Sequence, residues 1–266
     1  MTNALFQPIQ LGNIELKNRI VMPPMTRSRA TQPGNSANDM MAAYYAQRAS
    51  AGLIIAEGTQ ISPMGQGYAW TPGIYSDEQI AGWKKVTDAV HEKEGVIFAQ
   101  LWHVGRVTHP DNIGGEQPIS SSALKAENVK VFIDNGTDEP GFVDVVEPRE
   151  MTKEDIKEVV EQYRQAALNA IEAGFDGIEL HAAIRIPIRH LRICMKVDPE
   201  RSHVVILFDS GIWRNRIVFV RKEVVAEARI EIDVAEVRID QTCGVIEDSA
   251  NGDTSLMPGI VGQRRQ

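Results

Sequence analysis

The sequence predicts an α/β fold of the (β/α)8 TIM-barrel type, incomplete, with about the first four to five β/α units behind an N-terminal β-hairpin. Three observations lead to this prediction. Continuous apolar runs alternate with amphipathic helical patterns, which is typical of a parallel sheet with crossover helices. About four such units fit into roughly 180 of the 266 residues. The polar residues that stand out follow the apolar runs, where such a barrel places its chemistry.

The N-terminal segment predicts a hairpin and the first β/α unit. Two short alternating runs flank Gly12-Asn13, which has the turn chemistry of a β-hairpin. Residues 19–22 predict a short buried strand that ends at Pro23-Pro24. Helical spacing over residues 36–51 and a continuous apolar run over residues 52–56 predict the next helix and strand.

The alternation then repeats twice. Residues 77–94 predict an amphipathic helix, and residues 96–102 the strand that follows it. A polar stretch rich in Gly, Pro, Ser and Asp covers residues 105–148, and a loop of that length usually carries function. The next helix begins after Thr152 as its N-cap and ends at Gly174, before a buried strand over residues 175–181.

The character of the sequence changes after residue 183. We therefore divide the chain into an N-terminal barrel part, residues 1–183, and an aberrant C-terminal segment, residues 184–266. Within the second segment, residues 215–228 predict a helix and residues 237–239 a fifth strand. Because a complete barrel needs about 250 residues before insertions, we expect this barrel to be incomplete.

Composition narrows the classes of protein to which the chain can belong. The 43% hydrophobic and 24% charged residues are the balance of a soluble globular protein. A net charge of −8 argues against general affinity for nucleic acid or for anionic membranes, and no apolar run is long enough to cross a bilayer. Cys194 and Cys243 fit no metal-ligand spacing and predict ordinary reduced thiols. We expect no metal site and a cytoplasmic location.

The residues with chemical potential lie where the predicted strands end. Gln100 can donate and accept hydrogen bonds at once, and His181 can supply a donor to a developing anion. A lone histidine at a strand end is more often a satisfied polar residue, and Trp102 is more often core packing. A buried amide such as Gln100 costs roughly 1–3 kcal/mol unless it is paired. The residues thus predict a site for a flat heteroaromatic ligand, without naming the ligand.

A series of motifs over about residues 3–183 points to the kind of flat heteroaromatic ligand. In chain order they are Asn18-Arg-Ile-Val-Met-Pro-Pro-Met-Thr-Arg-Ser-Arg29, Tyr44-Tyr45-Ala-Gln-Arg48, Glu57-Gly-Thr-Gln-Ile-Ser62, Gly67-Tyr68, Pro72-Gly73-Ile74-Tyr75, Gln100-Leu-Trp-His-Val-Gly-Arg106 and Gly174-Phe-Asp-Gly-Ile-Glu-Leu-His-Ala-Ala183. Together they resemble the Old Yellow Enzyme family of flavin oxidoreductases. The bacterial N-ethylmaleimide and pentaerythritol tetranitrate reductase branch is the nearest match.

The resemblance implies a non-covalent FMN across the barrel mouth. The residues that would contact it are Pro24, Met25, Thr26, Gly58, Gln100, His181 and Arg238. Thr26 would meet the flavin O4/N5 side, Gly58 would offer its backbone, and Gln100 would pair with the pyrimidine edge. Pro24 and Met25 would lie under the ring.

The resemblance also implies a reaction. NAD(P)H reduces the flavin, which gives a hydride to the β-carbon of an activated alkene, a small electrophilic molecule. His181 is the implied catalytic residue, as one of two donors to the substrate's electron-withdrawing oxygen. Tyr68 and Trp102 would line the substrate pocket.

The sequence departs from the family pattern immediately after His181. Ile184 stands where the family has the second donor, and Ile186 where it has a proton-donating tyrosine. The late glycine-rich elements that bind the FMN phosphate have no counterpart. One hypothesis is a truncated gene product with a shifted reading frame between about residues 184 and 215, and the alternative is a divergent member with a rebuilt C-terminal half.

Three functions follow for testing. The first is an FMN-dependent NAD(P)H oxidoreductase, an ene-reductase. The second is a catalytically inactive remnant that associates with itself through exposed sheet edges. The third is a flavin binder without turnover that uses Thr26, Gln100 and Arg238.

Overall fold

A computed structural model describes residues 3–12, 14–134 and 140–181, together with the backbone of four later strands. The helices are α1 (Asp39–Ala46), α2 (Asp77–His91) and α3 (Lys153–Glu172), with short 3-10 turns at Ala4–Phe6, Pro63–Gly65 and Pro110–Asn112. The strands up to the long loop are β1 (Ile9–Leu11), β2 (Ile14–Leu16), β3 (Val21–Met22), β4 (Leu53–Gln60) and β5 (Ile97–Trp102). The later strands are β6 (Ile119–Ser120), β7 (Lys130–Ile133), β8 (Gly141–Asp144), β9 (Arg149–Glu150), β10 (Gly177–His181), β11 (Val204–Phe208), β12 (Arg216–Phe219), β13 (Arg238–Asp240) and β14 (Val245–Glu247).

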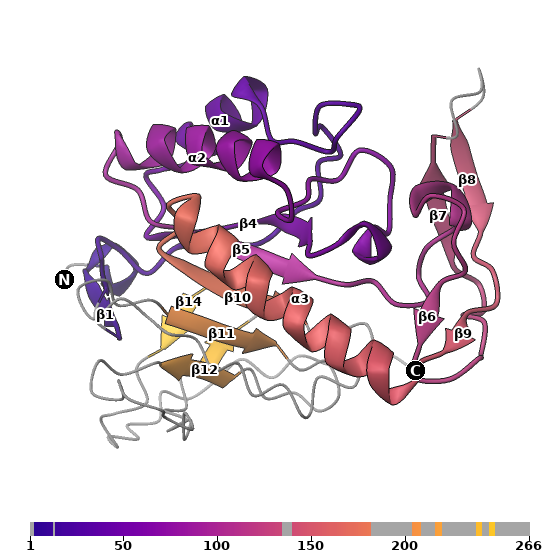
Figure 1. Cartoon of the computed structure of the whole chain (residues 1–266). Coiled ribbons are helices and arrows are strands. Elements are labelled where there is room, and N and C mark those ends of the chain that lie inside the picture. Colours follow the sequence, from indigo (N-terminus) through magenta and orange to yellow (C-terminus); the bar gives the residue numbers. More distant parts are fainter. Residues whose placement is uncertain are drawn as a thin grey trace, which may run out of the picture.

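The main sheet is built as predicted, from parallel strands joined by helices. Its strand order is β12-β11-β10-β5-β4-β3, and all neighbours are parallel except the antiparallel pair β11–β12. Helices α1, α2 and α3 lie together on one side of β4, β5 and β10 (Figure 1). Their apolar faces meet the strands in one core around Trp83, Tyr45, Tyr163 and Phe175. The α/β class of the prediction is confirmed.

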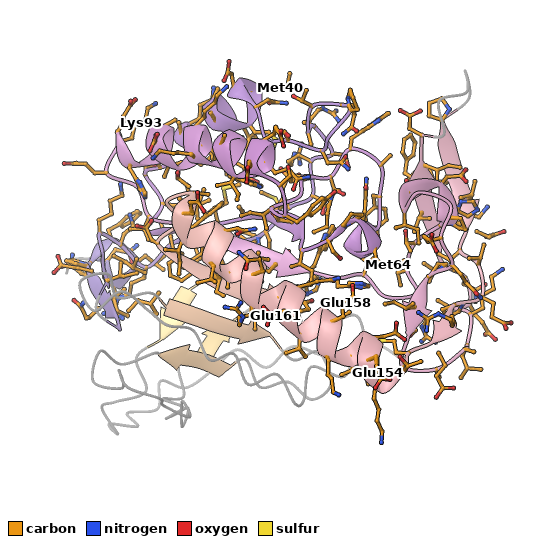
Figure 2. The ribbon with its side chains drawn as sticks, viewed as in Figure 1. Met40, Met64, Lys93, Glu154, Glu158 and Glu161 are labelled. Atoms are coloured by element: carbon orange, nitrogen blue, oxygen red, sulfur yellow. The ribbon has the colours of Figure 1, made fainter. Side chains whose placement is uncertain are left out.

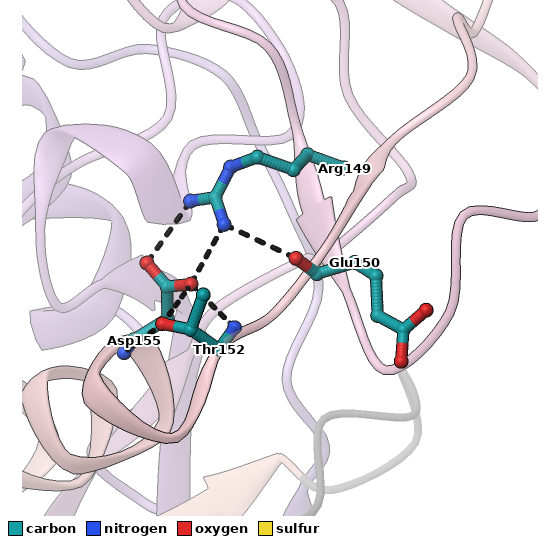
Figure 3. A network of polar contacts seen from close by, with 4 residues as sticks. All are labelled: Arg149, Glu150, Thr152 and Asp155. Atoms are coloured by element: carbon teal, nitrogen blue, oxygen red, sulfur yellow. Dashed lines mark hydrogen bonds and ion pairs between the residues drawn. The ribbon is translucent and has the colours of Figure 1, made fainter.

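Helix α3 shows how local sequence sets an element. Thr152 caps the helix through the backbone N–H of Asp155, and the Asp155 carboxylate accepts from the N–H of Thr152 at 2.6 Å. Arg149 grips the same carboxylate with two N–H groups, at 2.7 and 2.9 Å (Figure 3). Along the helix Glu154, Glu158 and Glu161 lie exposed on the outer side (Figure 2), while the opposite face packs on the sheet.

The N-terminal strands β1 and β2 cover the inner side of the sheet at the end where β4 and β5 begin, which we call the lower end. β1 and β2 pair antiparallel, with Ile9 opposite Leu16. Their apolar side chains form a second cluster with Leu53, Ile55 and Phe98. This pair lies near the beginnings of β4 and β5, whereas β7 and β8 lie beyond the ends of those strands (Figure 1).

The long polar stretch is more ordered than a loop. Within residues 105–148 the strands β7 and β8 pair antiparallel, and β6 pairs with β9. A third apolar cluster around Val131, Ile133 and Val145 packs residues 105–148 together, and the half-buried Tyr68 packs against it. The prediction of one long loop was therefore wrong over these strands, because alternation over so few residues gives only a weak strand signal.

The predictions for the C-terminal segment need two corrections. Residues 216–219 form strand β12 and not the start of the predicted helix. The fifth parallel strand of the main sheet is β11, which pairs with β10 from Gly177–Val204 to His181–Phe208. The strand predicted at residues 237–239 exists as β13, but it pairs with β14 in a separate sheet. The division of the chain at residue 183 stays a prediction.

No helix within the described ranges is both long enough and apolar enough to span a bilayer.

Candidate functional site

Alternate residues of β5 and β10 face the inside of the curved sheet. Ile97, Ala99 and Leu101 of β5 belong to the outer core beneath the helices, so Phe98, Gln100 and Trp102 point the other way. On β10, Ile178 and Leu180 join the same outer core, which turns Glu179 and His181 inward. Glu179 is opposite Gln100 in the register of the two strands.

An irregularity in β4 shapes the next part of this inner face. The register with β5 shifts between Ile55 and Gly58, so that Gly58 pairs with Gln100 and Gln60 with Trp102. A Cβ on Gly58 would lie 2.4 Å from Cε3 of Trp102. Only glycine therefore allows the indole to lie against this backbone.

Gln100 and Glu179 form a buried polar pair at the centre of the inner face. The Gln100 Nε2 donates to Glu179 Oε1 over 2.5 Å, and the two residues are 7% and 1% exposed. Burial raises the pKa of Glu179 to about 8, against the smaller opposing effect of the Gln100 hydrogen bond. The second carboxyl oxygen, Oε2, has no partner among the described residues.

Three aromatic side chains follow above this pair. The ring centroids of Trp102 and His181 are 6.2 Å apart, and the two rings are stacked with an interplanar angle of 25°. Trp102 also contacts Tyr68, and these two ring centroids are likewise 6.2 Å apart. Burial lowers the pKa of His181, so its imidazole is neutral at physiological pH and carries one N–H donor. The structure thus brings together Tyr68, Trp102 and His181, which the sequence singled out separately.

The segment after β3 carries the remaining predicted contacts. Pro24 is half-buried, while Met25 is 39% exposed and Thr26 is exposed. The buried Glu57, inside β4, anchors this segment, because its Oε2 accepts from the backbone N–H of Arg27 at 3.1 Å.

Tyr45 of α1 completes the anchor. Its hydroxyl donates to Glu57 Oε1 at 3.2 Å and accepts from the Glu57 backbone N–H at 2.8 Å. Burial raises the pKa of Glu57, and the hydrogen bonds from Arg27 and Tyr45 oppose that shift. Through these hydrogen bonds Glu57 joins α1, β4 and the segment after β3.

These residues fit a flat heteroaromatic cofactor such as FMN. Gly58 offers a backbone without a side chain, and Gln100 offers an amide that is only partly paired. Met25 leaves an exposed apolar surface next to Thr26. The side chain of Arg238, on β13, lies outside the described residues, as do Ile184 and Ile186.

Two further buried groups complete this region, of which Glu179 was missed from the sequence and His103 was noted only as a residue at the end of a strand. Glu179 could have been found from the two-residue spacing to His181, since an acidic residue inside an apolar strand needs a reason. His103 is buried and its pKa is lowered by burial to about 4. Its Nδ1 accepts from the backbone N–H of Gly105, and the backbone N–H of His103 donates to the hydroxyl of Tyr163, so His103 shapes the turn after β5.

Comparison with known proteins agrees with this geometry. Residues 4–184 match the NADH:flavin oxidoreductase / NADH oxidase family. Among curated relatives, 12-oxophytodienoate reductase 7 of Oryza sativa subsp. japonica is 47% identical over 182 residues, which cover 67% of this chain and 45% of the relative. Flavin oxidoreductase hxnT of Emericella nidulans is 45% identical over 185 residues, or 66% of this chain and 45% of the relative.

Solved structures show the same relation. Morphinone reductase superposes with a TM-score of 0.66 at 50% identity, covering 68% of this chain and 48% of that chain. The Old Yellow Enzyme homologue of Zymomonas mobilis gives a TM-score of 0.61 at 44% identity, covering 68% and 48%. The chain thus spans about half the length of the relatives it matches. By its matched residues and by its fold, the chain belongs to the NADH:flavin oxidoreductase family, the family of the Old Yellow Enzymes.

Proposed function

We propose that the chain is an FMN-dependent oxidoreductase that uses NAD(P)H to reduce the activated C=C bond of a small electrophilic alkene. The observation that carries the proposal is the inner face of β4, β5 and β10. There Gly58 pairs with the buried amide Gln100, and the neutral His181 lies two residues beyond Glu179, the partner of Gln100 on β10. Membership of the flavin oxidoreductase family supports FMN and NAD(P)H as the redox partners.

Each residue has a defined task in this proposal. FMN, when bound, would supply the hydride chemistry, taking a hydride from NAD(P)H and giving it to the β-carbon of the alkene. The Gln100 amide would bind the pyrimidine edge, and Thr26 with Met25 would meet the ring from the segment after β3. Gly58 would offer its backbone to the flavin, at the position where the Trp102 indole packs on β4.

His181 would act on the substrate. Its imidazole is kept neutral by burial, so it would donate one N–H to the electron-withdrawing oxygen of the alkene and polarise the double bond. Tyr68 and Trp102 lie on one side of His181 and would hold the carbon skeleton against it.

The test combines a spectrum and a rate. The purified chain is incubated with FMN, freed of unbound flavin and examined by visible absorption; a retained and shifted flavin band is expected. Anaerobic oxidation of NADPH by 2-cyclohexen-1-one then measures turnover. His181→Ala, assayed at saturating FMN, should lower the turnover rate about 10²- to 10³-fold. A colourless wild-type chain would refute the proposal.

A second function is favoured by one observation from the sequence. Ile184 and Ile186 occupy positions where the family has a second donor and a proton-donating tyrosine. We therefore propose as the alternative a flavin binder without turnover. A yellow protein that oxidises no NADPH with the enone would select this alternative.

Two further expectations belong to this proposal. β3 and β12 stand at the two ends of the strand order, and such ends favour self-association by strand pairing. Size-exclusion chromatography with light scattering should show a species larger than the monomer. A cytoplasmic location stays a prediction that fractionation of the source cells would check.

A further inference from the structure

Glu179 is the inward-facing residue that the proposed function leaves without a task. It lies at the centre of the inner face, between Gly177 and His181 on β10, and is 1% exposed. One of its oxygens accepts from Gln100, and the other has no partner among the described side chains. A buried polar atom left unpaired is unfavourable, so an apolar residue at this position would give a more stable sheet.

The hydrogen bond with Gln100 gives a reason for a carboxyl group at this position. A glutamine amide alone can present either its oxygen or its nitrogen in a given direction. Gln100 Nε2 donates to Glu179 Oε1 over 2.5 Å, so this oxygen, acting as the acceptor of the carboxyl group, holds the amide with its nitrogen toward β10. The Gln100 oxygen and its second N–H are then held in fixed directions on the inner face.

We propose that Glu179 is a positioning residue for the cofactor: by holding the Gln100 amide, it presents a fixed acceptor and a fixed donor to the pyrimidine edge of the flavin. This inference rests on the proposed binding of FMN. Glu179 itself touches neither cofactor nor substrate in this role. Preorganising one side chain saves about 0.5–1.5 kcal/mol on binding, which corresponds to about 2- to 10-fold in affinity.

The test is a double-mutant cycle on the full chain. Glu179→Met keeps the size of the side chain but removes the acceptor, and Glu179→Gln keeps a carbonyl oxygen that can accept from Gln100. Titration of FMN by fluorescence quenching should show about 2- to 10-fold weaker binding for E179M and wild-type affinity for E179Q. The midpoint potential of the bound FMN should fall in E179M and stay unchanged in E179Q.

The cycle separates positioning from a purely structural role. In a Gln100→Met background, E179M should cause no further loss of affinity, because the amide that it holds is gone. An equal loss in both backgrounds overturns the inference, as does E179M with wild-type affinity, or E179Q as weak as E179M. Thermal unfolding followed by circular dichroism shows that each variant is folded.

A measurement on the wild-type chain guards against a variant that does not fold. The side-chain amide resonances of Gln100, assigned by their loss in Q100M, should include one slowly exchanging proton without added FMN. Fast exchange of both protons overturns the inference. A wild-type chain that retains no FMN overturns this inference together with the proposed function, whereas FMN binding with an additive cycle overturns this inference alone.

Discussion

The two ends of the inner face of the sheet are built from the same strands, but one end is lined by apolar side chains and the other by polar ones. At the beginning of the strands, Leu53, Ile55 and Phe98 form an apolar cluster with β1 and β2. One layer further along, Gly58 and Gln100 take their place, and the row ends with His181. The lower end thus stabilises the fold through apolar contacts. The upper end, where the strands finish, has polar groups in place of those contacts, as a ligand site requires.

Removing the largest ring of the apolar end should have the largest effect. Phe98 is fully buried among the side chains of β1, β2 and β4. Phe98→Ala should lower the free energy of unfolding by about 3–5 kcal/mol, through lost burial and the cavity left behind. Urea unfolding followed by circular dichroism measures this change. Phe98→Leu is the control and should lose much less; equal losses would show that the buried volume of the side chain at position 98 does not set this stability.

A methyl group at the upper end should damage the site more than the fold. Gly58→Ala would place a Cβ 2.4 Å from Cε3 of Trp102, so the indole must move away from β4. We expect a loss of about 1–3 kcal/mol in unfolding free energy from overpacking, with a loss of FMN binding by fluorescence titration. Gly141→Ala, at a site with open space, is the matched control. Wild-type FMN affinity in Gly58→Ala would show that the position of the Trp102 indole against Gly58 does not affect the flavin site.

The contrast between the two ends also explains how much could be predicted from the sequence. Strong periodicity predicted α2, β5, α3 and β10 nearly at their observed bounds, because apolar spacing and the cap at Thr152 agree there. It also predicted that Gln100 and His181 would face a ligand. Short elements such as β7 and β8 were missed, since two or three alternating residues carry little signal.

What could not be predicted is the pairing between strands. Glu179 opposite Gln100 depends on the register of β10 with β5, and Gly58 opposite Gln100 depends on a bulge in β4. Neither is encoded by local periodicity. After residue 183 the local signals were weak, and strand pairing placed β11 where the sequence suggested nothing regular.

A smaller effect should follow from loosening the segment that carries Thr26. Tyr45→Phe removes the hydroxyl that pairs with both the carboxyl and the backbone N–H of Glu57. We expect about 1–2 kcal/mol less unfolding free energy, and weaker FMN binding, because Glu57 also holds the N–H of Arg27. Tyr44→Phe is a neighbouring control. Unchanged FMN affinity in Tyr45→Phe would separate this anchor from the site.

The smallest expected effect lies at the lower end and should leave the site untouched. His91 Nε2 lies 3.0 Å from Asp176 Oδ2, which also accepts from the backbone N–H of Ile97 at the start of β5. The hydrogen bond from Asp176 raises the pKa of His91. Because the folded pKa is the higher one, the stabilisation is complete below about pH 6.5, the ordinary histidine value, and is lost as the pH rises through the raised value. Both side chains are about one-third exposed, so solvent reduces the effect.

The urea midpoint of the wild type minus that of His91→Asn should therefore shrink between about pH 6 and pH 8, while FMN affinity stays equal. A difference that is constant with pH would mean that the charge of His91 contributes nothing, and that the lower end is held by its apolar cluster alone.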